Sequence, residues 1–299
     1  MAQPQEDIFA SESVKFVPWA PNWEEGLEIH GNIKSTSTLA TLCHKNFTDT
    51  ERELIHKGVD LIVGVKEAQV LDHPDILSQI VEPASTHSTS HFLVAHNPGP
   101  IDSITIQKEG DATILLEAIR VKEQNSKLVW RITSPLVEIG DCAVYTHDKN
   151  TSFYILRDGF EEAAIYFRKS AGNSKLRCFD VIVPSLQRET GKHVSIGFDD
   201  KSSYLLAQAT LDTIPNDCIK MSVREPQEKD GRYVLMFNGR VKRTSAKNFI
   251  LVHPSQPSRE ILLCGKSGVK KYVFDLNWPL SLIQGFGIFL TLFSKPRSH

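Results

Sequence analysis

Three histidines form the densest group of side chains that could hold a metal ion. His87, His91 and His96 lie close together in the segment HSTSHFLVAHN. A zinc site needs nitrogen, sulfur or carboxylate ligands brought together, typically by i, i+4 spacing on a helix or by a hairpin. These histidines lie instead in a Ser/Thr-rich stretch that runs into a strand-like segment. We therefore expect no metal site and no cofactor.

A thiol and an imidazole could also form a nucleophile and base pair. Cys178 and His193 are candidates, but Cys178 begins the β-rich run CFDVIVP, where a small buried residue is the simpler interpretation. The chain contains no GxSxG, HExxH, P-loop or GxGxxG motif. We therefore predict that the protein is not an enzyme.

The basic segment KRTSAK (242–247) could contact nucleic acid. Single-stranded nucleic acid is usually bound by cations interleaved with aromatic side chains, and this segment has none. An ordinary strand-and-turn role, with Asn248 bonding to the backbone, is equally compatible with the pattern. Nucleic acid is therefore not expected as a main partner.

Composition places the chain among soluble globular proteins. Of 299 residues, 40% are hydrophobic and 23% are charged, and the five cysteines show no CxxC spacing. The N-terminus lacks the apolar run of a signal peptide, so we expect a reducing compartment, the cytosol or the nucleus. Residues 1–86 carry six Lys/Arg against fourteen Asp/Glu, whereas residues 220–275 carry twelve against five. The basic part could meet an anionic partner or simply solvate strands.

Residues 1–86 differ in pattern from the rest and predict a small α/β extension of unknown role. A helix is expected at Asp49–Lys57, a buried strand at residues 60–65, and a short helix within HPDILSQIVEP, ending before Pro83. The polar stretch ASTHSTS (84–90) is the candidate linker. We place a second, larger domain at residues 88–299.

Short β-rich runs bounded by turn residues fill most of this second domain and predict a mainly β sandwich or barrel. The runs are HFLVAHNP, SITIQKEGD, TILLEAIRV, KLVWRIT, CAVYTH, SFYILRDG, AAIYFRKS, CFDVIVP, HVSIGF, KSSYLLAQAT, CIKMSV, RYVLMFNGRV, NFILVHP, EILLCGK and KYVFDL.

The segment LSLIQGFGIFLTLF (280–293) interrupts this pattern because it is apolar on every side except for one glutamine. Such a helix must be enclosed by protein or lipid. Pro279–Phe293 spans fifteen residues, about 22 Å as a helix, against the roughly 30 Å hydrocarbon core of a bilayer. We therefore predict a buried helix inside a closed antiparallel β-barrel of about twelve strands.

Two segments give the sequence a specific resemblance. FNGRVKRTSAKNF (237–249) and QGFGIFLTLFSK (284–295) resemble the two signatures of the tubby C-terminal domain. Between them, ILLCGKSGVKKYVFDLNWPLS follows the same course of strand, turn, strand and helix entry, and the similarity extends over about 200 residues. The chain is thus similar to tubby-like proteins, whose fold is a closed barrel around a hydrophobic C-terminal helix.

This resemblance implies a non-enzymatic adaptor. Tubby-like barrels bind phosphoinositide headgroups, notably phosphatidylinositol 4,5-bisphosphate, through a lysine and an arginine two apart on one strand. The matching positions here are Arg120 and Lys122, which would share a strand face. A third family arginine corresponds to a position near Ala143. The chain also ends PRSH, where the family usually ends in Cys-Glu.

Two function classes follow from the resemblance. The first is a monomeric phosphoinositide-binding adaptor that tethers or transports a protein cargo, located in the cytoplasm and at the plasma membrane, with the nucleus or cilium as further sites. The second is an interaction or regulatory module that has lost lipid binding and works in the nucleus or a ubiquitin ligase complex. Arg120 and Lys122 favour the first class, and the missing arginine favours the second.

Overall fold

The computed structural model describes residues 74–121, 127–148, 151–168, 178–199, 202–211, 213–229 and 232–294. All of these residues belong to one compact unit, Asn46–His299. The helix predicted at Asp49–Lys57 and the strand predicted at residues 60–65 lie outside the described residues. Among the described helices, none has the length and apolar character needed to cross a membrane.

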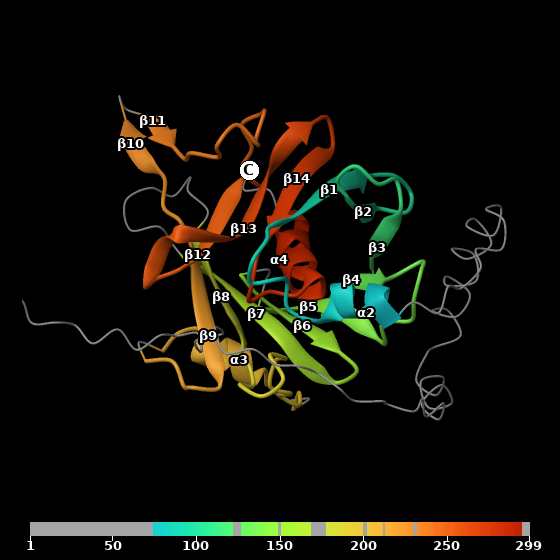
Figure 1. Cartoon of the computed structure of the whole chain (residues 1–299), viewed down its shortest axis with the longest axis vertical. Coiled ribbons are helices and arrows are strands. Elements are labelled where there is room, and N and C mark those ends of the chain that lie inside the picture. Colours follow the sequence, from blue (N-terminus) through green and yellow to red (C-terminus); the bar gives the residue numbers. More distant parts are fainter. Residues whose placement is uncertain are drawn as a thin grey trace, which may run out of the picture. The chain divides into compact units, whose positions relative to one another are not determined.

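Twelve antiparallel strands close into the barrel that the sequence predicted (Figure 1). Chain neighbours are mostly spatial neighbours, and the exceptions are the β1–β14 and β9–β12 contacts that complete the ring. The strands are β1 (Ser90–Asn97), β2 (Ser103–Lys108), β3 (Ile114–Arg120), β4 (Leu128–Thr133), β5 (Cys142–Asp148), β6 (Ser152–Arg157), β7 (Phe160–Arg168), β8 (Cys178–Pro184), β9 (Cys218–Val223), β12 (Phe249–His253), β13 (Gln256–Gly268) and β14 (Lys271–Leu276).

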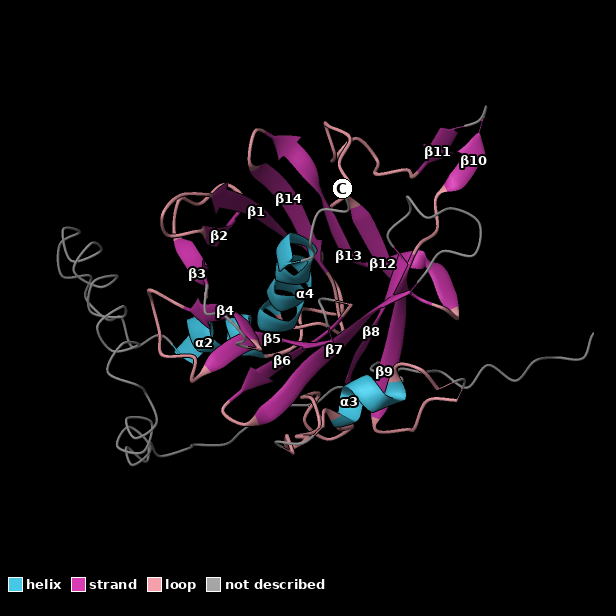
Figure 2. Cartoon of the chain, turned by 180° about the vertical axis from the view of Figure 1, so that it is seen from behind, coloured by secondary structure: helices cyan, strands magenta, loops and turns pink. Residues whose placement is uncertain are grey.

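Helix α4 (Leu282–Ser294) lies inside the barrel, as predicted (Figure 2). Its first turn is fixed by a reciprocal capping box, in which Gln284 N donates to Ser281 Oγ (3.2 Å) and Ser281 N donates to Gln284 Oε1 (2.9 Å). The glutamine also donates through Nε2 to the Glu162 carbonyl of β7 (3.0 Å). The one strongly polar residue of the apolar segment therefore both starts the helix and ties it to the wall.

Helix α2 (Pro74–Val81) is the short helix predicted before Pro83, and it belongs to the same hydrophobic core as α4. Ile80 is fully buried in that core. Pro83 forms a bridge with Ser281, and Ala84 N donates to the Leu280 carbonyl (2.9 Å). The chain between α2 and β1 therefore lies against the start of α4.

Two segments that we predicted as strands take other forms. KSSYLLAQAT contains helix α3 (Tyr204–Gln208), and HVSIGF forms only isolated bridges. Buried Glu161 explains the helix, because its carboxylate accepts from Ser203 Oγ (2.6 Å), Tyr204 N (2.6 Å) and Leu205 N (3.0 Å). An anion that binds the free N–H groups at a helix start stabilises that start.

The third correction concerns RYVLMFNGRV. Only Arg232–Val234 is a strand, β11, and it pairs with β10 (Gln227–Lys229) in a hairpin outside the barrel (Figure 1). The following segment, 235–248, leaves the ladder and covers the outer face of β12, β13 and β14 with Leu235, Phe237 and Val241. These apolar side chains bury a second cluster outside the barrel wall, which explains their strand-like pattern.

Candidate functional site at the barrel rim

Arg120, a predicted headgroup ligand, is the last residue of β3 and lies at the end of the barrel where α4 also ends. It pairs in register with Trp130 of β4, and its guanidinium carbon lies 5.7 Å from the centre of the indole ring. Trp130 is fully buried and donates through Nε1 to Ser294 Oγ of α4 (2.8 Å). Arg120 therefore projects on the inner face of the sheet, over the rim.

Asp102 and His96 complete the surroundings of this arginine. Asp102 Oδ2 lies 3.5 Å from Arg120 Nη1, and its other oxygen lies 2.7 Å from His96 Nε2. The Arg120 side chain retains 35% exposure, against 15% for Asp102. An arriving anion could therefore reach the guanidinium, but it would compete with a carboxylate that is already present.

Lysines extend the positive charge around the rim. Lys247 Nζ lies 4.7 Å from the centre of the Phe293 ring near the end of α4, and the same ring contacts His96 edge-on at 4.8 Å. The β13–β14 hairpin adds Lys266 in β13, Lys270 in the turn and Lys271 in β14, and the Lys270 carbonyl accepts from His96 N (2.9 Å). None of these three lysines has an acidic partner among the described residues. We call His96, Arg120, Lys247, Lys266, Lys270 and Lys271 the rim cations, counting His96 as one when it is protonated.

The second predicted ligand, Lys122, lies outside the described residues, so its place beside Arg120 stays a prediction.

The pairing of the strands shows on which face of the sheet the third family arginine would lie. Ala143 pairs with Arg131, whereas Arg120 pairs with Trp130, the neighbour of Arg131 on β4. Adjacent strand residues point to opposite faces. An arginine at 143 would therefore project outward, away from Arg120, where Arg131 already pairs with Asp141 (3.3 Å).

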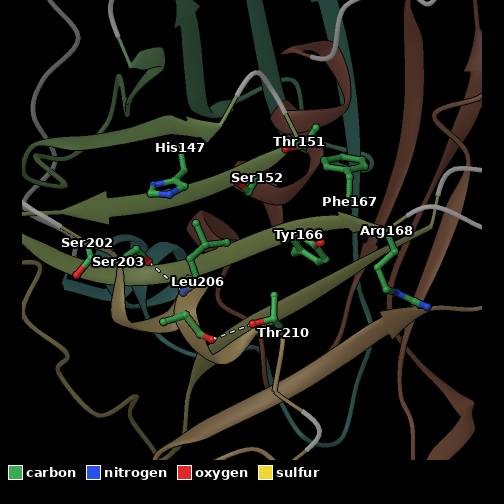
Figure 3. Close-up of a pocket in the computed structure, with 11 residues that line it drawn as sticks. His147, Thr151, Ser152, Tyr166, Phe167, Arg168, Ser202, Ser203, Leu206 and Thr210 are labelled. Carbon is green, nitrogen blue, oxygen red and sulfur yellow. Dashed lines mark hydrogen bonds between the residues drawn. The ribbon is translucent and has the colours of Figure 1, made fainter.

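A pocket of about 870 Å³ lies elsewhere on the outer face, between β6, β7 and α3 (Figure 3). Hydroxyl groups of Thr151, Tyr166, Ser202 and Thr210 line it. Its arginine, Arg168, makes an ion contact with Asp180 at 3.0 Å through Nε, without an aligned hydrogen bond. This pocket therefore offers a neutralised cation and is a poorer phosphate site than the rim.

The grouping of His91, Glu109 and Asp275 resembles a metal site in composition. Arg240 already occupies the carboxylates, donating to Asp275 (2.6 and 2.8 Å) and to Glu109 (2.7 and 3.2 Å). These hydrogen bonds raise the pKa of the Arg240 guanidinium. The cluster is therefore an ion-pair clamp between the 235–248 segment and the barrel, with the positive charge supplied by arginine.

Cys178 and His193 do not form a reactive pair. Cys178 begins β8, and His193 lies beside the other end of that strand, where its Nδ1 is 2.7 Å from the Pro184 carbonyl oxygen. At about 3.3 Å per residue the two ends are roughly 20 Å apart. His193 is therefore too far away to act as a base for the Cys178 thiol.

Comparison with known proteins agrees with this architecture. The model of the Tub family matches residues 142–295, just over half of the chain. Tubby protein homolog 1 of Caenorhabditis elegans is 31% identical over 139 residues, which cover 44% of this chain and 32% of that protein. Tubby-related protein 2 of Mus musculus is 41% identical over 66 residues, covering 22% of this chain and 12% of that protein.

A more distant relative, protein king tubby of Drosophila sechellia, is 27% identical over 155 residues, covering 48% of this chain and 35% of that protein. The similarity thus spans about a third or less of the length of these relatives.

Proposed function

The chain belongs to the Tub family, and from this premise we propose that it is a non-enzymatic adaptor whose barrel rim binds phosphoinositide headgroups. Phosphatidylinositol 4,5-bisphosphate is the favoured ligand, and Arg120 and Lys122 are the favoured phosphate contacts. The adaptor would act as a monomer and tether or transport a partner protein at the plasma membrane, with the nucleus and the cilium as further locations.

The observation that carries this proposal is the position of Arg120. The guanidinium is fixed over Trp130 and remains partly exposed. An arginine held in one orientation loses little freedom when it forms paired hydrogen bonds to a phosphate. The other rim cations supply longer-range attraction for the remaining charge of a bisphosphate, which is screened over about 8–10 Å at physiological ionic strength.

Co-sedimentation with vesicles tests the proposal. Full-length protein should bind phosphatidylcholine vesicles that contain phosphatidylinositol 4,5-bisphosphate, more weakly as salt is raised, and should prefer them to phosphatidylserine vesicles of equal charge. Each charge-assisted contact contributes about 1.5–3 kcal/mol, so Arg120→Ala with Lys122→Ala should weaken binding at least about a hundredfold. The melting temperature should change little, because Asp102 keeps its contact with His96.

A matched control is Lys108→Ala with Arg188→Ala, which removes two positive charges from exposed sites outside the rim. This variant should bind the same vesicles almost as well as the wild type. Equal losses in both double variants would mean that net charge, and not the rim, governs binding.

Two observations favour a second function. The chain has Ala143 near the position of the family's third arginine, and Asp102 partly neutralises Arg120. A barrel with no lipid affinity would act as an interaction or regulatory module in the nucleus or in a ubiquitin ligase complex. Failure of the wild type to bind phosphoinositide vesicles at low salt would favour this function.

A further inference from the structure

A groove of about 520 Å³ lies on the outer side of the barrel, between the end of β9 and the 235–248 segment. Most of its lining is apolar, and the apolar residues are Val223, Pro226, Val234, Leu235, Phe237, Val241, Ala246 and Phe249. Val234 of this lining is 39% exposed, and apolar surface continues beyond the groove at Met236, which is 71% exposed. The exposed Met236 is therefore available to a ligand.

One wall of this groove, the 242–248 loop, is fixed by hydrogen bonds. The backbone N–H groups of Lys242 and Arg243 both donate to the Lys266 carbonyl (3.1 and 3.0 Å). Asn248 donates to the Arg243 carbonyl (2.8 Å) and accepts from Lys266 N (2.9 Å). With the Arg240 clamp described above, these bonds hold the 242–248 loop against β13. A ligand would thus meet a preformed surface.

The groove carries an uncompensated positive charge. Arg224, Lys242 and Arg243 line it, and none of its lining residues is acidic. Arg224 is neutralised by Glu260 at 3.0 Å. Lys242 and Arg243 are exposed and have no acidic partner among the described residues. Two positive charges therefore stand at the edge of an apolar groove.

We propose that this groove binds a short acidic segment of a partner protein, anchored by one bulky apolar side chain. The concave apolar lining fits an inserted side chain, whereas the flat surface of a bilayer could not enter it. Nucleic acid is disfavoured because stacking of successive bases needs several exposed aromatic rings, and none of the lining aromatics is exposed. An apolar anchor surrounded by complementary charge is a common recognition arrangement. The inference goes beyond headgroup binding and does not depend on Arg120.

Selection from a random dodecamer phage library on full-length protein tests this inference. The selected peptides should be rich in Asp and Glu and contain a Leu, Ile, Phe or Trp. A synthetic copy of the most enriched peptide should bind Lys242→Glu with Arg243→Glu at least roughly tenfold more weakly than the wild type, since two favourable charge contacts become repulsive. Val234→Asp, at an exposed groove position, should weaken binding similarly.

The control is Lys108→Glu with Arg188→Glu, which reverses the same number of charges outside the groove and should keep full peptide affinity. Selected peptides without acidic residues, or equal binding by the groove and control variants, would overturn the inference. Vesicle binding distinguishes peptide binding in the groove from headgroup binding at the barrel rim. A groove variant that loses phosphoinositide vesicles and keeps the peptide would show that the loop belongs to a membrane surface, which would also overturn the inference.

Discussion

Arg120 is the residue on which the functional account depends, and its neighbours set its availability. Its guanidinium carbon lies 5.7 Å from the centre of the Trp130 indole, and the Asp102 carboxylate offsets part of its charge. The same carboxylate lies 2.7 Å from His96 Nε2, so Arg120 shares its acidic partner with a second side chain. The rim therefore combines a fixed cation with a built-in competitor for its ligand.

Replacing the competitor should strengthen anion binding. Asp102→Asn keeps the size of the side chain and removes its charge, so Arg120 no longer shares its attraction with a carboxylate. A partly exposed ion pair is worth about 0.2–1 kcal/mol, which predicts an affinity gain of up to roughly fivefold for phosphoinositide vesicles. The matched control is Asp141→Asn, which removes the carboxylate charge that faces Arg131 on the outer face. A gain equal in both variants would contradict the assignment of the rim.

His193 should make stability depend on pH. Burial lowers the pKa of the His193 imidazole below the usual 6.5. The carbonyl oxygens of Pro184 and Pro279, which face its two ring nitrogens, act in the opposite direction but have a smaller effect. The unfolded chain then binds the proton more readily, so the stabilisation is full above 6.5 and is lost as the pH falls through the folded pKa. The free energy of unfolding, measured with denaturant, should fall as the pH is lowered below 6.5, and His193→Gln should reduce the slope of this fall. Parallel slopes would contradict this role.

Sequence reasoning could reach only part of this site. The spacing of Arg120 and Lys122 predicts a shared strand face, because side chains alternate along any strand. The partner Asp102 comes from the residue before β2, and Trp130 comes from β4, so neither can be inferred without the register. Likewise, the sequence matches Ala143 to a family arginine by position. That this position faces outward can be inferred only from the pairing of Ala143 with Arg131.

At the scale of elements, helix α4 determines how the barrel is filled. Its uniform apolar character was sufficient to predict burial, and twelve of the β-rich runs form the wall around it. The three incorrect strands were apolar runs that cover the outside of the barrel, where alternation also arises. Periodicity shows that one face of a segment is buried. It does not show whether that face packs inside the barrel or against its outer surface.

Close packing around α4 gives a test at this scale. A Cβ added to Gly287 would collide with the side chain of Ile155 on β6. Alanine favours a helix over glycine by up to about 1 kcal/mol, while overpacking a core costs about 1–3 kcal/mol. We expect Gly287→Ala to lower the free energy of unfolding by about 1–2 kcal/mol in denaturant titrations. Gly197→Ala, where an added Cβ meets nothing within 4 Å, is the control and should change little.

At the scale of the whole molecule, the position of the domain boundary matters most. Our sequence-based boundary near residue 86 separates α2 from the barrel. The burial of Ile80 and the contacts of Pro83 and Ala84 with the start of α4 favour a boundary before α2. This packing joins segments about 200 residues apart, which composition and charge could not reveal.

Two truncations test this boundary. A fragment that begins at residue 74 should fold and melt as a single cooperative unit. A fragment that begins at residue 88 loses Ile80 from the core, and deleting one such side chain costs about 2–5 kcal/mol. Calorimetry should therefore show a lower melting temperature for the shorter fragment. Equal melting temperatures would support a boundary near residue 86 instead.

The most direct test of the central claim is a calorimetric titration with inositol 1,4,5-trisphosphate, the soluble headgroup of phosphatidylinositol 4,5-bisphosphate. The full-length wild type should bind one equivalent, Arg120→Ala should bind roughly tenfold more weakly, and Arg120→Lys should recover part of the loss. Wild type and Arg120→Ala with equal affinity, or a wild type that releases no binding heat and shows no stabilisation by the ligand, would contradict headgroup binding at the barrel rim.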